Sequence, residues 1–454
     1  MKKHIYIIMA LVMVLTFIPV DIYAYDFYGD FVDVKIKTKN INEEISLYSP
    51  QGFVLYDKGN KDLELMDIDN EEILIKFNGD GFIDVLDIFG ELITTISDDG
   101  SNIIGSRDTF ESIIQVDKDR YRDYILFLIN KDKIHIINHI DIEHYLYGVV
   151  PREIPASSPK EALKAQAVVA RSYAYTSLNN HTNEGYNLCN TTHCQVYGGY
   201  DWEKPSTNEA VNETYGDYVS FNGDIVSTPY HSNSGGYTED SGKVWGGSLP
   251  YLVGVEDIYS LNAPNSSWTV NITPRELKEK LLQSGIDVGE ILNIEAMETT
   301  DSNRVKDVKI IGSKKEEIIS GDKFRSIIGS TYLKSTLFSI NKEGSQSTKR
   351  VYVIDGFSSI PKEISLRGIH IIDGYGNSTV NRSSVNRVTG EETSTSVDGT
   401  FTNAPTTFVL EGKGYGHGVG MSQYGAIEMA KQGFNYDDII QHYYKGVEII
   451  NKGK

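Results

Sequence analysis

Glu153 is the residue whose sequence setting best suits acid–base chemistry. It lies in residues 148–155 (Gly-Val-Val-Pro-Arg-Glu-Ile-Pro), where two prolines restrict the backbone around one carboxylate. We expect a Pro-x-x-x-Pro turn that holds Glu153 outside any regular element, close to the N-terminus of the next helix. The alternative is an ordinary solvated glutamate in a turn, and the spacing alone does not exclude it.

Two glycine-rich segments suit the close approach of a ligand to the backbone. Residues 232–238 (Ser-Asn-Ser-Gly-Gly-Tyr-Thr) place paired glycines among hydroxyl and amide groups, although a simple glycine turn has the same pattern. In residues 414–425 (Gly-Tyr-Gly-His-Gly-Val-Gly-Met-Ser-Gln-Tyr-Gly) glycine alternates around a tyrosine and a histidine. We expect a strand with one empty face there, against which something must lie. This segment lacks the lysine and the spacing of a phosphate loop.

Cysteine and histidine residues form a possible metal site. Cys189, His193 and Cys194 lie within six residues, and His181 precedes Cys189 by eight. Two thiolates and two imidazoles would complete a tetrahedral zinc site, which would be structural because no coordination position stays open. A disulfide closing a small loop, and two buried free thiols, remain the alternatives.

The elements that must position these groups indicate an α+β chain. From residue 25 to about residue 138, short alternating runs between turn signals predict a β-rich N-terminal module. A mixed α+β domain with a substrate cleft is expected from residue 139 to residue 454. Its first helix is predicted to begin with Ser158 as N-cap and Pro159 as first helical residue, and others are expected at residues 274–283, 422–432 and 436–445. Residues 377–407, rich in Ser, Thr and Asn, predict an exposed insertion.

Charge and the N-terminus limit the partners and the location. The 454 residues carry a formal charge of −20, which disfavours nucleic acid and anionic lipid surfaces as partners. Residues 1–24 combine a short basic start with an apolar run, which predicts a secretory signal peptide or an uncleaved N-terminal anchor. We therefore expect an exported protein, extracellular or associated with the cell wall.

Three motifs resemble the SpoIID/LytB family in their order along the chain. The first is the Glu153 segment at residues 148–155, and the second and third are the glycine-rich segments at residues 232–238 and 414–425. The resemblance runs from about residue 139 to residue 446, and the Gly-Tyr-Gly-His-Gly-Val-Gly-Met-Ser-Gln segment is highly specific to that family. Other matching segments are residues 145–151, residues 165–167 with Arg171, and residues 250–252. Ile154 stands where methionine is usual, and Tyr424 where tryptophan is common.

The resemblance implies a lytic transglycosylase of peptidoglycan, with Glu153 as its single catalytic acid and base. It also implies zinc held by cysteines and histidines in the loop from His181 to Cys194, and no organic cofactor. The residues expected to line the glycan cleft are Arg171, Ser234, Gly235, Tyr415, His417 and Gln423, with a structural salt bridge as the alternative for Arg171. LytB-type members imply a second function: a non-catalytic peptidoglycan-binding protein that enhances a cell-wall amidase.

Overall fold

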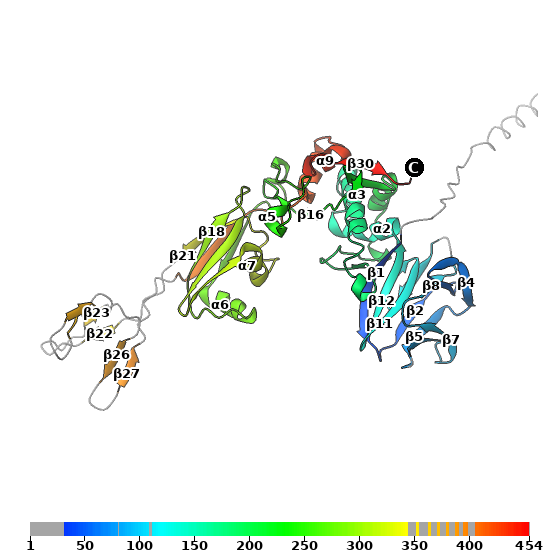
Figure 1. Cartoon of the computed structure of the whole chain (residues 1–454), viewed down its shortest axis with the longest axis horizontal. Helices are drawn as coiled ribbons and strands as arrows, with labels where there is room; N and C mark the ends of the chain where they lie inside the picture. Colours follow the sequence, from blue (N-terminus) through cyan, green and yellow to red (C-terminus); the bar gives the residue numbers. More distant parts are fainter. Residues whose placement is uncertain are drawn as a thin grey trace, which may run out of the picture.

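Figure 1 shows a computed structural model of the chain. It describes residues 31–79, 81–108, 111–343 and 405–453 in full, and between them the backbone of six short strands from Val351 to Val397. The predicted signal segment lies outside the described residues, as does most of the predicted insertion at residues 377–407. None of the helices in the described part is both long and apolar enough to span a bilayer.

The N-terminal β module consists of two sheets that share one apolar core. One sheet has the order β13 (Leu188–Cys189), β1 (Phe31–Asn40), β12 (Lys133–Asp141), β11 (Tyr124–Asn130), β8 (Asn102–Ser106), β3 (Phe53–Asp57) and β4 (Asn60–Ile68). The other has the order β10 (Asp119–Arg122), β9 (Ile113–Val116), β2 (Ile45–Tyr48), β5 (Glu72–Phe77), β6 (Phe82–Leu86) and β7 (Leu92–Ser97). Alternate residues of β1 are buried, as period-two patterning requires.

A helical domain follows β12 directly and is built around one alanine-rich helix. This helix, α3 (Lys160–Thr176), contacts α2 (Ile142–Glu153), α4 (Pro205–Glu213), α8 (Gln423–Lys431), α9 (Tyr436–Tyr443) and β14 (Asp217–Phe221). Its small side chains let these neighbours approach closely. The predicted cap of α3 is wrong: Pro159 takes the N-cap position with extended backbone (ψ 143°), and no side chain caps the helix.

An inserted lobe separates the two glycine-rich segments and has its own apolar core. It comprises β17 (Trp268–Ile272), α6 (Pro274–Gln283), β18 (Ile291–Thr299), β19 (Val305–Gly312), β20 (Glu316–Ser320), α7 (Gly321–Ile328), β21 (Phe338–Glu343) and β28 (Thr407–Gly412). The predicted helix at residues 274–283 is confirmed as α6, which begins with a capping box. In Figure 1 this lobe and the β module lie on opposite sides of the helical domain.

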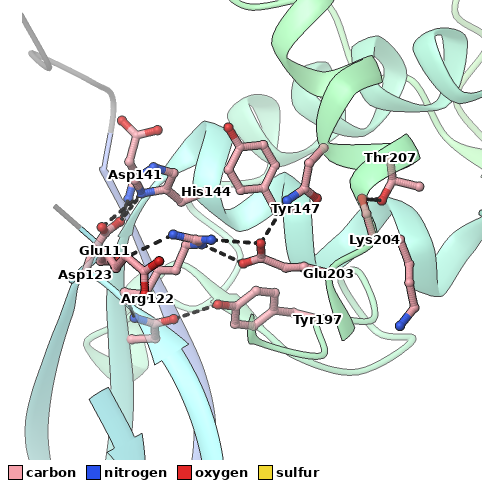
Figure 2. A network of polar contacts seen from close by, with 12 residues as sticks. Glu111, Arg122, Asp123, Asp141, His144, Tyr147, Tyr197, Glu203, Lys204 and Thr207 are labelled. Carbon is pink, nitrogen blue, oxygen red and sulfur yellow. Dashed lines mark hydrogen bonds and ion pairs between the residues drawn. The ribbon is translucent and has the colours of Figure 1, made fainter. Parts of the chain in front are cut away.

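A polar network joins the β module to the helical domain (Figure 2). Arg122 at the end of β10 donates from Nε and Nη2 to the two carboxylate oxygens of Glu203, at 2.6 and 3.0 Å. Asp123 lies 2.9 Å from Nδ1 of His144 in the first turns of α2. Bidentate, largely buried pairs of this kind fix the geometry of the elements they join. The β module therefore fixes the position of α2, whose last residue is Glu153.

Candidate active site and metal cluster

Glu153 lies at the C-terminal end of α2. The prediction that it lies outside any regular element is wrong, because the helix continues through Pro151. That proline removes one backbone donor near the end of the helix, and the C-cap Ile154 still donates to the carbonyl of Val150 at 3.1 Å. Ile154 then takes extended backbone (φ −130°, ψ 142°), which ends the helix directly after Glu153.

An open pocket of about 320 Å³ brings parts of all three motifs together. Its lining residues are Pro151, Arg152, Glu153, Ile154, Pro155, Ser232, Gln423, Tyr424 and Ile427. Parallel pairing of β16 (Tyr230–His231) with β29 (Met421–Ser422) places the two glycine-rich segments side by side. Glu153 is the sole acidic side chain among the lining residues in the described part of the chain.

The environment of Glu153 favours the protonated acid. Burial raises the pKa of its carboxyl, and a hydrogen bond from the backbone N–H of Val196 to Oε1, at 3.1 Å, opposes that shift only in part. The side chains of Gln423 and Tyr230 also oppose it. The net effect is a raised pKa, so the carboxyl keeps its proton to a higher pH than an exposed glutamate does.

Two residues that the sequence analysis missed support this carboxyl. Tyr230 faces Glu153, and burial raises its pKa well above the usual value, so its hydroxyl stays protonated. Gln195 donates to the Tyr230 hydroxyl at 3.0 Å and also to the carbonyl of Ala170. Tyr230 precedes the first glycine-rich segment by two residues, and Gln195 directly follows Cys194, but neither position carries a signal in the sequence.

His181, Cys189, His193 and Cys194 form one cluster, with their ligand atoms all within 4.8 Å of one another. Sγ of Cys194 lies 3.5 Å from Nε2 of His181 and 3.5 Å from Nδ1 of His193, and Sγ of Cys189 lies 3.8 Å from the same Nδ1. A tetrahedral zinc with ordinary Zn–S and Zn–N lengths separates sulfur from nitrogen by about 3.6 Å. Cys189 and Cys194 are both buried, and no disulfide joins them in this structure. The donor set therefore fits zinc.

The orientation of His181 supplies an independent sign of a metal site. Its Nδ1 lies 2.7 Å from Oε1 of Glu184, and the ring of Tyr186 stacks on its imidazole with centroids 4.7 Å apart. A carboxylate on Nδ1 holds the proton there and leaves the Nε2 lone pair directed at the cluster. Metal-binding histidines are commonly oriented in this way.

Arg171 does not line the pocket. Its side chain has no exposed surface, and Nε and Nη2 donate to the two carboxylate oxygens of Glu143 at 2.7 and 2.6 Å. Nη1 donates to the carbonyl of Asp217 at 3.0 Å. The structure therefore shows the salt bridge that was the alternative for this residue.

Ser234 and Gly235 also lie away from the pocket of Glu153. The Ser234 hydroxyl is buried and donates to Oδ2 of Asp257 at 2.6 Å, which fixes the glycine turn. Gly235 lines a separate groove of about 750 Å³ between this turn and the inserted lobe. Of the second motif, only Ser232 reaches the pocket.

The predicted strand with one empty face is wrong for the segment around His417. Four glycines of this segment have positive φ, from 70° to 116°: Gly414, Gly416, Gly418 and Gly420. The backbone therefore departs from the extended conformation of a strand at each of them. At Gly418 a β-carbon would lie 2.5 Å from Cζ of Arg304, a residue of the inserted lobe. That arginine donates to the carbonyl of Ser234 at 2.7 Å and so joins the lobe to both glycine-rich segments.

His417 is held as a neutral structural residue. Its Nδ1 accepts from the N–H of Val419 at 3.0 Å, so Nε2 carries the proton and donates to the carbonyl of Tyr230 at 3.1 Å. Burial lowers its pKa to about 4. Tyr415 is half-buried, and its backbone pairs with that of Asn233. These two residues shape the loops behind the pocket, whereas Gln423 lines it beside Glu153.

Comparison with known proteins gives two family matches and several relatives. Residues 130–221, which hold Glu153 and the cysteine–histidine cluster, match the family described as stage II sporulation protein (SpoIID). Residues 253–357, mostly in the inserted lobe, match a domain of unknown function, DUF8618.

The relatives cover most of this chain. An amidase enhancer of Bacillus subtilis (strain 168) is 34% identical over 308 residues, which are 67% of this chain and 40% of that protein. Stage II sporulation protein D of the same organism is 26% identical over 331 residues, 69% of this chain and 75% of that protein. An uncharacterized protein of Brachyspira hyodysenteriae is 29% identical over 332 residues, 73% of this chain and 72% of that protein. The chain thus spans less than half the length of the amidase enhancer.

Proposed function

Because the chain belongs to the SpoIID/LytB family, we propose that it is an exported peptidoglycan lytic transglycosylase with Glu153 as general acid and base. The observation that carries this proposal is a single carboxyl of raised pKa in an open pocket, with no second acidic side chain among the described residues that line it. Glycoside hydrolases typically use two carboxylates, one as acid and one as base or nucleophile. A transglycosylase needs only one, since its nucleophile belongs to the sugar.

The reaction can be written with Glu153 as the sole proton carrier. The protonated carboxyl donates to the oxygen that links N-acetylmuramic acid to N-acetylglucosamine, and the bond from muramic C1 to that oxygen breaks. The 2-acetamido group of the substrate stabilises the developing cation. The ionised carboxylate then takes the proton of the muramic C6 hydroxyl, whose oxygen closes the 1,6-anhydro ring on C1. Protonated Glu153 is restored, and no water is consumed.

Glu153→Gln tests this proposal because the amide keeps the shape of the side chain but can neither give up nor take up a proton as the carboxyl does. We expect release of anhydro-muropeptides from purified sacculi, measured by mass spectrometry, to fall by about 10²-fold or more. Glu428→Gln on the outer face of α8 is the matched control and should leave the release unchanged. Circular dichroism verifies that both variants fold. Normal release by the Glu153→Gln variant would remove Glu153 from its catalytic role.

We further propose that His181, Cys189, His193 and Cys194 hold a structural zinc ion. Bound there, zinc would cross-link the loop between α3 and α4 through four protein ligands. The residues that follow the last ligand reach the active site: Gln195 contacts Tyr230, and Val196 donates to Glu153. The role of the cluster is therefore to hold these two donors in place.

A second function, the enhancement of a cell-wall amidase, is favoured by one observation. The relative that is 34% identical bears the name amidase enhancer. In that case the pocket of Glu153 binds glycan without cleaving it. Product analysis separates the two functions: anhydro ends formed by the protein alone support the transglycosylase, whereas an increase in amidase rate without anhydro ends supports the enhancer.

A further inference from the structure

The hairpin of β6 and β7 carries an exposed apolar tip. Ile88, Phe89 and Leu92 expose 54%, 84% and 60% of their surface. The turn that presents them is ordered, because one oxygen of Asp87 accepts from the backbone N–H groups of both Phe89 and Glu91 at 2.8 Å. The turn is thus fixed by hydrogen bonds, and it exposes the side chain of Phe89 to solvent. Exposed apolar groups that are held together in this way commonly mark an interaction site.

The outer strand of the same hairpin is the edge of its sheet. β7 pairs with β6 on one side and is the last strand of its sheet among the described residues. Its sequence, Leu-Ile-Thr-Thr-Ile-Ser, has high strand propensity and contains no charge and no proline. Natural proteins usually protect such an edge with charges, prolines or bulges. β7 has one bulge near its start, opposite Val85 and Leu86, and the uncharged remainder of this edge can accept a strand from another protein.

Negative charge predominates in the part of the chain that forms this edge and its neighbouring strands, and it determines the kind of partner. Residues 71–99, which include β5, β6 and β7, hold eight acidic residues and a single basic one, Lys76. That lysine is itself 3.5 Å from a carboxylate oxygen of Glu44. A second copy of the chain would bring the same negative charge to the contact, and anionic wall polymers would also be repelled. The complementary partner is a protein with a basic surface around an apolar strand.

We propose that the β6–β7 hairpin is the docking site for a basic partner protein, which adds a strand to β7 and covers Ile88, Phe89 and Leu92. This inference rests on the enhancer part of the proposed function, and the partner is then the cell-wall amidase. In Figure 1, β7 lies at the end of the β module away from α2, whose last residues line the pocket of Glu153. An amidase bound to β7 therefore leaves that pocket free for glycan.

The test measures binding of the full chain to a purified basic cell-wall amidase from the same bacterium. The double variant Ile88→Ser, Phe89→Ser should bind at least ten times more weakly than the unaltered protein. Glu72→Lys with Glu91→Lys should also weaken binding and flatten its salt dependence. Ile318→Ser with Tyr332→Ser, two exposed apolar residues of the inserted lobe, is the control and should bind normally.

The outcomes separate this inference from the proposed function. Unchanged binding of the hairpin variants would overturn the docking site and leave the enhancer function standing. No binding and no stimulation by the unaltered protein would overturn both. Self-association through the hairpin, seen by sedimentation and abolished by Phe89→Ser, would replace the amidase with a second copy. Glu153→Gln should bind the amidase normally, whatever its effect on glycan cleavage.

Discussion

Arg171→Met should destabilise the helical domain strongly, because it leaves the Glu143 carboxylate buried without its partner. Two charge-assisted hydrogen bonds of 2.7 and 2.6 Å are lost, together with the donation to the carbonyl of Asp217. Breaking a buried pair on one side costs about 3–5 kcal/mol. Since a domain is stable by roughly 5–15 kcal/mol, this loss removes a large part of its stability.

Urea unfolding followed by circular dichroism at a helix-sensitive wavelength measures this loss, because α3 and its neighbours dominate that signal. Arg120→Met is the matched control: its pair with Asp201 is exposed, so its loss should cost no more than about 1 kcal/mol. Combining Arg171→Met with Glu143→Leu removes both charges and should recover much of the loss. Normal stability of the Arg171 variant with weakened glycan binding would refute the structural role and restore the substrate contact.

Two further predictions concern the metal cluster and the pH dependence of Glu153. Protein purified without chelator should contain about one zinc ion per chain by elemental mass spectrometry. The Cys189→Ser variant should lose the metal and melt at a lower temperature. Absence of metal together with a Cys189–Cys194 disulfide would contradict the zinc site. The pKa of Glu153 is higher in the folded protein than its ordinary value of 4.5, so the folded state favours the protonated carboxyl. The stability that this carboxyl contributes is therefore full below pH 4.5 and is lost as pH rises through the raised pKa. Glu153→Gln should therefore melt above the unaltered protein at pH 7 and level with it below pH 4.5; a lower melting temperature of the variant at pH 7 would show that the pocket stabilises the charged form.

Local patterns in the sequence predict several elements because their signals lie within one element. Alternating burial in β1 follows from period two, and α6 begins at the predicted residue because its capping box and its proline both lie in the first turn. The end of α2 is different. Proline in the first motif indicates a turn, but the packing of α2 on α3 and on the β module maintains the helix to Glu153.

Long-range contacts account for what the sequence could not show. The glycines around His417 look like an alternating strand, yet they are required where other chain segments approach: Gly418 lies against Arg304, and Gly420 lies against the carbonyl of Pro229. Both neighbours are distant in the sequence. For the same reason Arg171 could be associated with the glycan, because nothing local indicates that Glu143 lies opposite it.

The contacts between the cluster and the pocket connect the proposed structural zinc site to the proposed catalytic carboxyl of Glu153. The chain passes from Cys194 through Gln195 to Val196, so a single residue separates a cluster residue from the one whose N–H binds the Glu153 carboxylate. Leu188 and Cys189 pair in parallel with β1, which ties the other side of the loop to the β module. If this loop loosened, Val196 would withdraw its hydrogen bond, and the pKa of Glu153 would rise further because burial would then be less opposed. Metal loss should therefore shift the pH profile of glycan cleavage to higher pH before it unfolds the domain.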